Sequence, residues 1–108
     1  MILNISLVLE TEKEKNARVV VSRLNKVISA GTPVLERYHK GGTKALLKKG
    51  MSDASWPEAM LTGLTVAQSF GRAWTIYGDA QEELNLVGAE FSVVGINWCE
   101  ISLSRKDF

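Results

Sequence analysis

The residue types that most often carry chemistry are scarce in this chain of 108 residues, which holds one histidine and one cysteine. His39 lies in a segment rich in glycine and lysine, and 59 residues separate it from Cys99. No two of His39, Cys99 and the carboxylates show the spacing of metal ligands, so we expect neither a metal ion nor a cofactor. Alternating apolar residues around Cys99 place its thiol in a core, where burial raises the pKa and leaves the group inert.

The same scarcity of catalytic residue types argues against three further kinds of site, two catalytic and one phosphate-binding. A nucleophilic triad would need His39 with Asp53 and Ser52 or Ser55, but Ser55 is better explained as a helix cap. Residues 41–44 lack the residue order of a phosphate-binding loop. General acid–base chemistry on His39 lacks the second base that most such sites use. We therefore expect no catalytic residue, and an enzyme built on His39 is left as an alternative that substitution of His39 would test.

Charge is divided unevenly along the chain, although the net charge is only +1. Residues 1–54 carry ten Lys and Arg against five Asp and Glu, whereas residues 55–108 carry three against seven. The basic group is Arg37, His39, Lys40, Lys44, Lys48 and Lys49. The acidic and aromatic group is Tyr77, Asp79, Glu82, Glu83, Glu90 and Trp98.

Each group has a functional and a structural interpretation. The basic group, with Tyr38 as a stacking partner, could bind a phosphate or an RNA strand. The structural alternative is that the group belongs to a solvated loop. Aromatic anchors among steering carboxylates fit a protein interface. The alternative for the second group is that its tryptophan, together with Trp74, belongs to the core and that its acids form a solvated turn.

Hydrophobic periodicity predicts one domain over residues 1–108. Five strands are expected, at residues 2–9, 34–38, 72–77, 84–94 and 96–105. Capping boxes at Thr11 and Ser55 predict two helix starts, and Gly63 inside the second helix predicts close approach of another backbone. Residues 39–50 are expected to form a loop, with turns at Gly78 and Gly95. The order β-α-β-α-β-β-β predicts an α+β fold with a mixed or mainly antiparallel sheet and two helices on one face.

The composition also bears on location. No apolar run approaches the roughly 18 residues that cross a bilayer, so we expect no membrane partner. A lone cysteine allows no internal disulfide, which fits a reducing compartment. We therefore expect a cytoplasmic protein.

The layout resembles a known class of proteins. The chain resembles small bacterial immunity proteins, including those of contact-dependent growth inhibition. The resemblance lies in its size, its first strand, the helix from Thr11, the helix start Ser55-Trp56-Pro57-Glu58 and the terminal strand. The resemblance implies a cytoplasmic, non-catalytic protein that binds and neutralises one cognate toxin, and it transfers no functional residue. The acidic and aromatic group is then the candidate interface. The alternative is a small nucleic-acid- or phosphate-binding module that uses the basic group.

Overall fold

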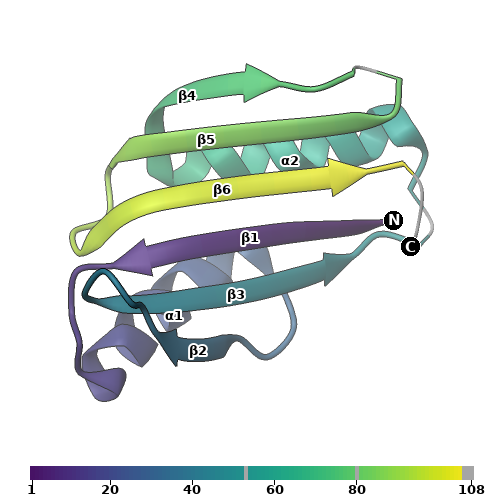
Figure 1. Ribbon diagram of the computed structural model, residues 1–108. Coiled ribbons are helices and arrows are strands. Elements are labelled where there is room, and N and C mark those ends of the chain that lie inside the picture. Colours follow the sequence, from purple (N-terminus) through teal and green to yellow (C-terminus); the bar gives the residue numbers. More distant parts are fainter. Residues whose placement is uncertain (53, 80, 106–108) are drawn as a thin grey trace.

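The protein forms one six-stranded antiparallel sheet with two helices, in a computed structural model that describes residues 1–52, 54–79 and 81–105. The elements are β1 (Ile2–Leu9), α1 (Glu14–Ile28), β2 (Val34–Arg37), β3 (Thr43–Gly50), α2 (Trp56–Phe70), β4 (Gly71–Tyr77), β5 (Glu83–Phe91) and β6 (Ile96–Ser104). Figure 1 shows the sheet order β2-β3-β1-β6-β5-β4. The predicted α+β fold is confirmed, and its sheet is antiparallel throughout.

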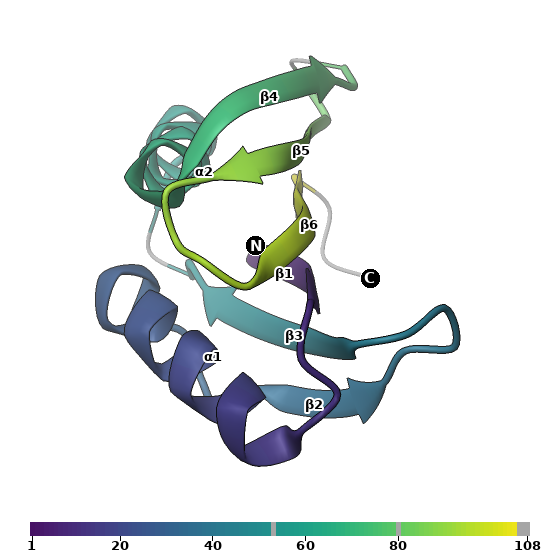
Figure 2. The same ribbon diagram turned by 90° about the vertical axis from the view of Figure 1, so that its left-hand side faces the viewer.

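The connections place the first and last strands at the centre of the sheet. β1, α1 and β2 form a split β-α-β unit, because β3 lies between β1 and β2 and is antiparallel to both. From β3 the chain crosses through α2 to the far edge at β4, and then returns through β5 to β6, which pairs with β1. α1 covers the β3 half of the sheet and α2 the β4 and β5 half (Figure 2). The edge strands are therefore β2 and β4.

The core lies between the sheet and the helices, since alternation turns one side of each central strand toward them. The strands contribute Leu3, Ile5, Leu7, Leu9, Ala45, Leu47, Leu84, Leu86, Cys99, Ile101 and Leu103. The helices contribute Ala17, Val21, Leu24, Ile28, Ala59, Val66, Ala67 and Phe70. Each large apolar side chain buried in this way stabilises the fold by roughly 1.5–3 kcal/mol.

The start of α2 is as predicted. The Ser55 hydroxyl accepts a hydrogen bond from the Glu58 N–H at 3.3 Å and donates one to the Glu58 carboxylate at 2.9 Å. Pro57 lies in the first turn, where an amide would have no helical partner. These contacts satisfy part of the backbone that every helix start leaves open.

The capping box predicted at Thr11 is wrong. α1 begins at Glu14, and the Thr11 hydroxyl accepts from the Lys13 N–H at 3.1 Å instead of from a helical amide. The Thr11 carbonyl accepts a hydrogen bond of 2.7 Å from the hydroxyl of Thr43, the first residue of β3. Thr11 therefore joins the first helix to the sheet.

The loop predicted over residues 39–50 is also wrong, because β3 occupies most of it. Ala45 and Leu47 are buried on the helix side, and the residues between them alternate to the other side. Pairing with β1 and β2 on both sides holds this strand despite its lysines and glycine, which have low β propensity. The preceding turn needs Gly42, which has φ 88° and where a Cβ atom would clash with the Leu9 carbonyl oxygen.

Two smaller differences concern β5 and its surroundings. The strand predicted to reach residue 94 ends at Phe91, and a turn follows in which Gly95 has φ 99°, as expected of a turn glycine. Gly88 does not split the strand; the irregular pairing lies where the first residues of β4 meet the end of β5.

Gly63 is buried, but its neighbours are side chains. A Cβ atom there would lie 3.5 Å from Leu3 Cδ1 and 3.7 Å from Leu84 Cδ2, both ordinary contact distances. The predicted approach of another backbone is therefore wrong, and the helix would tolerate an alanine at this position.

Candidate functional site

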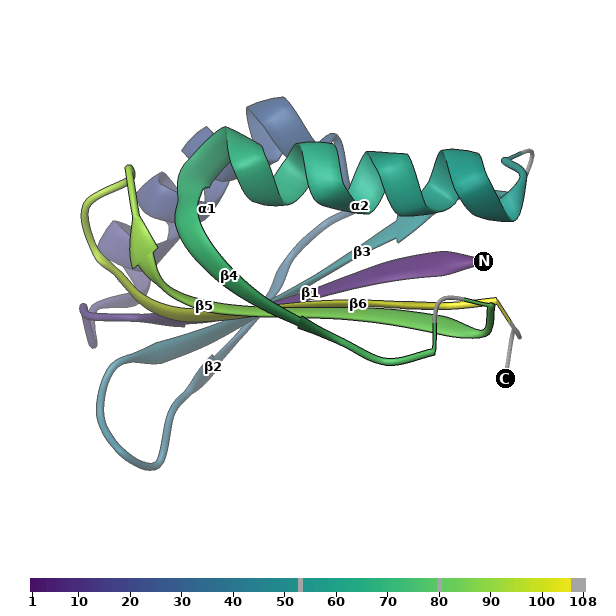
Figure 3. The same ribbon diagram turned by 90° about the horizontal axis from the view of Figure 1, so that it is seen from above.

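One side of the sheet is left without a helix. Both helices lie on the same side, and no described element covers the other (Figure 3). We call this side the helix-free face. Alternation and register place on it Ile2, Asn4, Ser6, Val8, Glu36, Lys44, Leu46, Lys48, Thr75, Tyr77, Glu83, Asn85, Val87, Trp98, Glu100 and Ser102.

The register of the central strands fixes which of these side chains are neighbours. Lys44, Val8 and Trp98 stand side by side on β3, β1 and β6. Because adjacent strands lie about 4.8 Å apart, the backbones of Lys44 and Trp98 are about 10 Å apart. The next row on the same face places Ser6 next to Glu100, and the row after it places Asn4 next to Ser102. Across the two central strands the face therefore carries mostly small polar side chains, with one large aromatic side chain, Trp98, and one carboxylate, Glu100.

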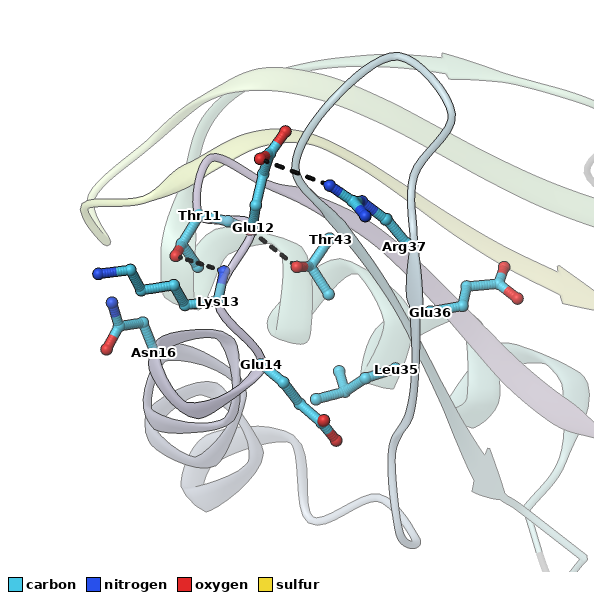
Figure 4. A pocket seen from close by; sticks show the side chains of 9 residues that line it. All are labelled: Thr11, Glu12, Lys13, Glu14, Asn16, Leu35, Glu36, Arg37 and Thr43. Atoms are coloured by element: carbon cyan, nitrogen blue, oxygen red, sulfur yellow. Dashed lines mark hydrogen bonds and ion pairs between the residues drawn. The ribbon is translucent and has the colours of Figure 1, made fainter.

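The charged side chains of this face lie on both sides of β1. Lys44 and Lys48 are on β3, whereas Glu83 and Glu100 are on β5 and β6 and Glu36 is on the edge strand β2, where it points away from its neighbours (Figure 4). In the part of the chain that the structure describes, none of these five forms an ion pair. Their charges are consequently available to a binding partner.

A hollow opens beside Trp98. Its volume is about 320 Å³, and its lining is Ala73, Trp74, Thr75, Val87, Gly88, Ala89, Glu90 and Trp98. Small residues of β4 and β5, Ala73, Gly88 and Ala89, share its lining with Trp98 and leave this space open. This volume is at the lower end of the range for ligand pockets, and it suits a single large side chain.

The predicted acidic and aromatic group is divided by the structure. Half-exposed Tyr77 ends β4, Asp79 and Glu82 follow in the turn, and Glu83 begins β5. The Asp79 carbonyl accepts from the N–H groups of Glu82 at 2.9 Å and Glu83 at 2.7 Å, which ties Asp79 to the start of β5. Glu90 lies about 23 Å farther along β5 at roughly 3.3 Å per residue.

Glu90 instead lies with Trp98 at the hollow. The third aromatic residue considered, Trp74, is partly buried against the core and also lines the hollow. Its Nε1 donates to the Ala67 carbonyl at 3.1 Å, and its ring meets those of Phe70 and Phe91 edge-on at 5.7 and 5.9 Å. Trp74 therefore packs against the core, as the structural alternative expects, and one part of it also borders the hollow.

The predicted basic group is also divided. Lys44 and Lys48 share the helix-free face, but the neighbouring Lys49 points to the opposite side, where its Nζ donates to the Ile28 carbonyl at 2.6 Å. Arg37 turns toward α1, with Nη2 3.9 Å from Glu12 Oε2.

The remaining two basic residues, His39 and Lys40, lie at the tip of the β2–β3 hairpin. The His39 ring packs against that of Tyr38 at 4.7 Å. Strand alternation separates neighbours in sequence, so six basic residues in one segment do not make one surface.

Sequence analysis missed a second hollow, of about 680 Å³, between the start of α1 and the edge strand β2 (Figure 4). Its lining is Thr11, Glu12, Lys13, Glu14, Asn16, Leu35, Glu36, Arg37 and Thr43. No local pattern could indicate it, since three separate segments assemble it. A helix start favours an anion, but the carboxylates of Glu12 and Glu14 oppose one. Arg18 already binds Glu14, with Nη2 2.6 Å from Oε1.

Conventional catalytic groups are not assembled at either hollow. Across residues 1–52, 54–79 and 81–105, no cluster of three or more His, Cys, Asp or Glu could hold a metal ion. Burial, and secondarily the charge of Glu100, raises the pKa of the Cys99 thiol above its ordinary 9.0, so the thiol stays protonated. Asp53, considered above for a triad, lies outside the described residues. Neither described helix is long and apolar enough to cross a bilayer.

Comparison with known proteins gives no relative. No protein-family model, curated protein or solved structure matches the chain. Any functional assignment therefore depends on the geometry and charge of this chain's own residues.

Proposed function

We propose that the protein is a non-catalytic immunity protein, which binds and neutralises one cognate protein toxin through the helix-free face. The observation that carries this proposal is the combination of Trp98, the hollow beside it and the small polar side chains of β1 and β6, on a side of the sheet that no described element covers. Protein interfaces typically place an aromatic anchor at a pocket and surround it with polar groups.

The charges on the two sides of β1 define the kind of partner. Lys44 and Lys48 suit a carboxylate-bearing segment, and Glu83, Glu90 and Glu100 suit a basic one across the sheet. Such opposed charges orient a partner at encounter and act against other partners. The proposal includes the cytoplasm as the compartment, and it needs neither a cofactor nor a membrane.

The test is binding to the toxin encoded beside this gene, measured by calorimetry with purified proteins. Ser102→Arg places a long cation at the centre of the helix-free face, and we expect at least about 100-fold weaker binding, which corresponds to about 2.7 kcal/mol. Gln68→Arg adds the same side chain to an exposed position of α2 and is the matched control. Unchanged affinity of Ser102→Arg, or equal losses in both variants, would show that this face is not the interface.

Charge reversal tests the predicted polarity of the interface. Glu83→Lys removes a carboxylate from the helix-free face, whereas Glu14→Lys makes the same change at the start of α1. We expect the first to weaken toxin binding and the second to leave it unchanged, because only Glu83 lies on the proposed interface. The opposite ranking would contradict the assignment.

A nucleic-acid-binding module is the second candidate, because Lys44 and Lys48 share a face with Trp98, and some sheet-based modules stack RNA bases on aromatic side chains. Three carboxylates on the same face weigh against it. Anisotropy with a single-stranded RNA at low and moderate salt decides the question. This candidate requires binding that falls steeply with salt and that Lys48→Glu weakens more than the control Lys15→Glu on α1.

A further inference from the structure

The two edges of the sheet differ in how they are protected from pairing with other strands. β2 is four residues long and ends in Glu36 and Arg37, a short and charged edge of the kind that resists association. β4 is seven residues long, contains no lysine or proline, and carries Ile76 and Tyr77 at 58% and 50% exposure. Among the described elements, only β5 pairs with it. The outer edge of β4 is therefore open to a further strand.

We propose that β4 pairs with β4 of a second copy of this chain, antiparallel and about a two-fold axis at Thr75, to form a homodimer with one continuous sheet. An axis normal to the sheet keeps the helices of both copies on the same side. Opposed residues then lie on the same side of the sheet, as antiparallel pairing requires. The dimer contact lies along the outer edge of the sheet and shares Ala73, Thr75 and Tyr77 with the border of the helix-free face, but the proposal does not depend on the toxin interface.

The side chains of β4 fit this register. With Thr75 opposite itself, Ile76 comes opposite Trp74 of the second copy on the helix side. On the helix-free side, Tyr77 comes opposite the small Ala73. Ile76 thus meets a tryptophan that already packs in its own chain, and Tyr77 meets a small residue that leaves room for its ring. Exposed apolar surface at Ile76 and Tyr77 is thereby covered in both copies.

The charges fit the same register. Arg72 of one copy comes opposite Gly78 and beside Asp79 of the other, and the two-fold axis produces this contact twice. Both residues are exposed, and neither forms an ion pair within the described part of its own chain. Assembly stops at two copies because the short, charged β2 edge resists further pairing, which gives the closed symmetry usual for homodimers.

The experiment is sedimentation of the full chain by analytical ultracentrifugation between about 1 µM and about 1 mM, a range suited to a small, transient interface. We expect a shift with concentration from one chain of 11.9 kDa to twice that mass. Ile76→Lys should remain monomeric over the whole range, since it replaces an apolar contact by a charged side chain of the kind that protects edge strands from pairing. Val94→Lys, at an 89% exposed position in the β5–β6 turn, should dimerise like the wild type.

A charge exchange tests the register. Arg72→Asp and Asp79→Arg should each weaken the dimer at least threefold, and the double variant should recover most of the affinity, because it restores opposite charges in both contacts. Asp79→Arg also removes an acceptor for the Gln81 N–H, so recovery in the double variant separates pairing from damage to the turn. A monomeric wild type up to the highest concentration, or an Ile76→Lys variant that dimerises normally, would overturn the proposal.

Discussion

Lys48 and Lys49 are adjacent and chemically identical, yet the structure gives them opposite environments, which makes them a matched pair for a stability measurement. Lys49 Nζ donates a hydrogen bond of 2.6 Å to the Ile28 carbonyl in the last turn of α1, whereas Lys48 is exposed on the helix-free face. Replacing Lys49 by methionine keeps most of the aliphatic chain and removes the charge and the donor.

The expected cost follows from two contributions. A hydrogen bond to a charged group contributes roughly 1.5–3 kcal/mol, and a cation at a helix C-terminus adds roughly 0.3–1 kcal/mol. Lys49 is only half-buried, so water replaces part of the lost hydrogen bond, and we expect Lys49→Met to lower the free energy of unfolding by about 1 kcal/mol. For a domain of this size, that corresponds to a fall in Tm of roughly 4 °C. Lys48→Met should change stability by less than about 0.5 kcal/mol.

Urea unfolding followed by tryptophan fluorescence measures both variants at unchanged m value. Equal stabilities of Lys49→Met and Lys48→Met would refute the contact between β3 and α1. A lower m value for Lys49→Met would instead indicate that the native state has become less compact, and the difference in free energy could not then be attributed to one hydrogen bond.

Other consequences of the structure can be checked by the same unfolding assay. Gly63→Ala should raise the free energy of unfolding by about 0.5–1 kcal/mol, because the added methyl group fits between existing side chains. Gly42→Ala should lower it by more than about 2 kcal/mol, because this residue has a positive φ and its Cβ atom would clash with backbone. Equal effects of the two substitutions would contradict both environments. Ser55→Ala should cost about 1 kcal/mol through loss of the helix cap, and a cost near zero would show that the cap is dispensable. The folded state keeps the proton of the Cys99 thiol after the unfolded chain has lost it, so stability should fall as pH rises above about 9, by up to about 1.4 kcal/mol per pH unit more than in Cys99→Ala. Parallel pH profiles for wild type and Cys99→Ala would mean that this thiol does not titrate differently in the two states.

The parts of the fold that were predictable are those that local chemistry determines. Alternation around Cys99 identified the last strand and its buried side, and the Ser55 cap with Pro57 identified the start of α2 to the residue. Glycines at the turns Gly78 and Gly95 adopt positive φ, as expected there. In each case the signal lies within a few residues of the feature it predicts.

The parts that were missed depend on partners distant in sequence. β3 has the composition of a loop, and it is a strand because β1 and β2 pair with it on both sides. The Thr11 hydroxyl matches a capping pattern, but its carbonyl is bound by Thr43, 32 residues away, and α1 starts later. The different roles of Lys48 and Lys49 could not be predicted while their segment was taken for a loop. The helix-free face depends on the register of five strand pairings, which no local pattern specifies.

The central position of β6 has a consequence for how the chain folds as it is made. β1 is synthesised first among the strands, but one of its two neighbours follows about 90 residues later, as in the pairing of Leu7 with Cys99. At ribosomal rates of roughly 5–20 residues per second, one edge of β1 is open for on the order of ten seconds. A chain stalled before residue 96 would hold two pieces of sheet with a gap between them. β1, which has a partner strand on both sides in the finished protein, would then be the strand most able to pair with another unfinished copy.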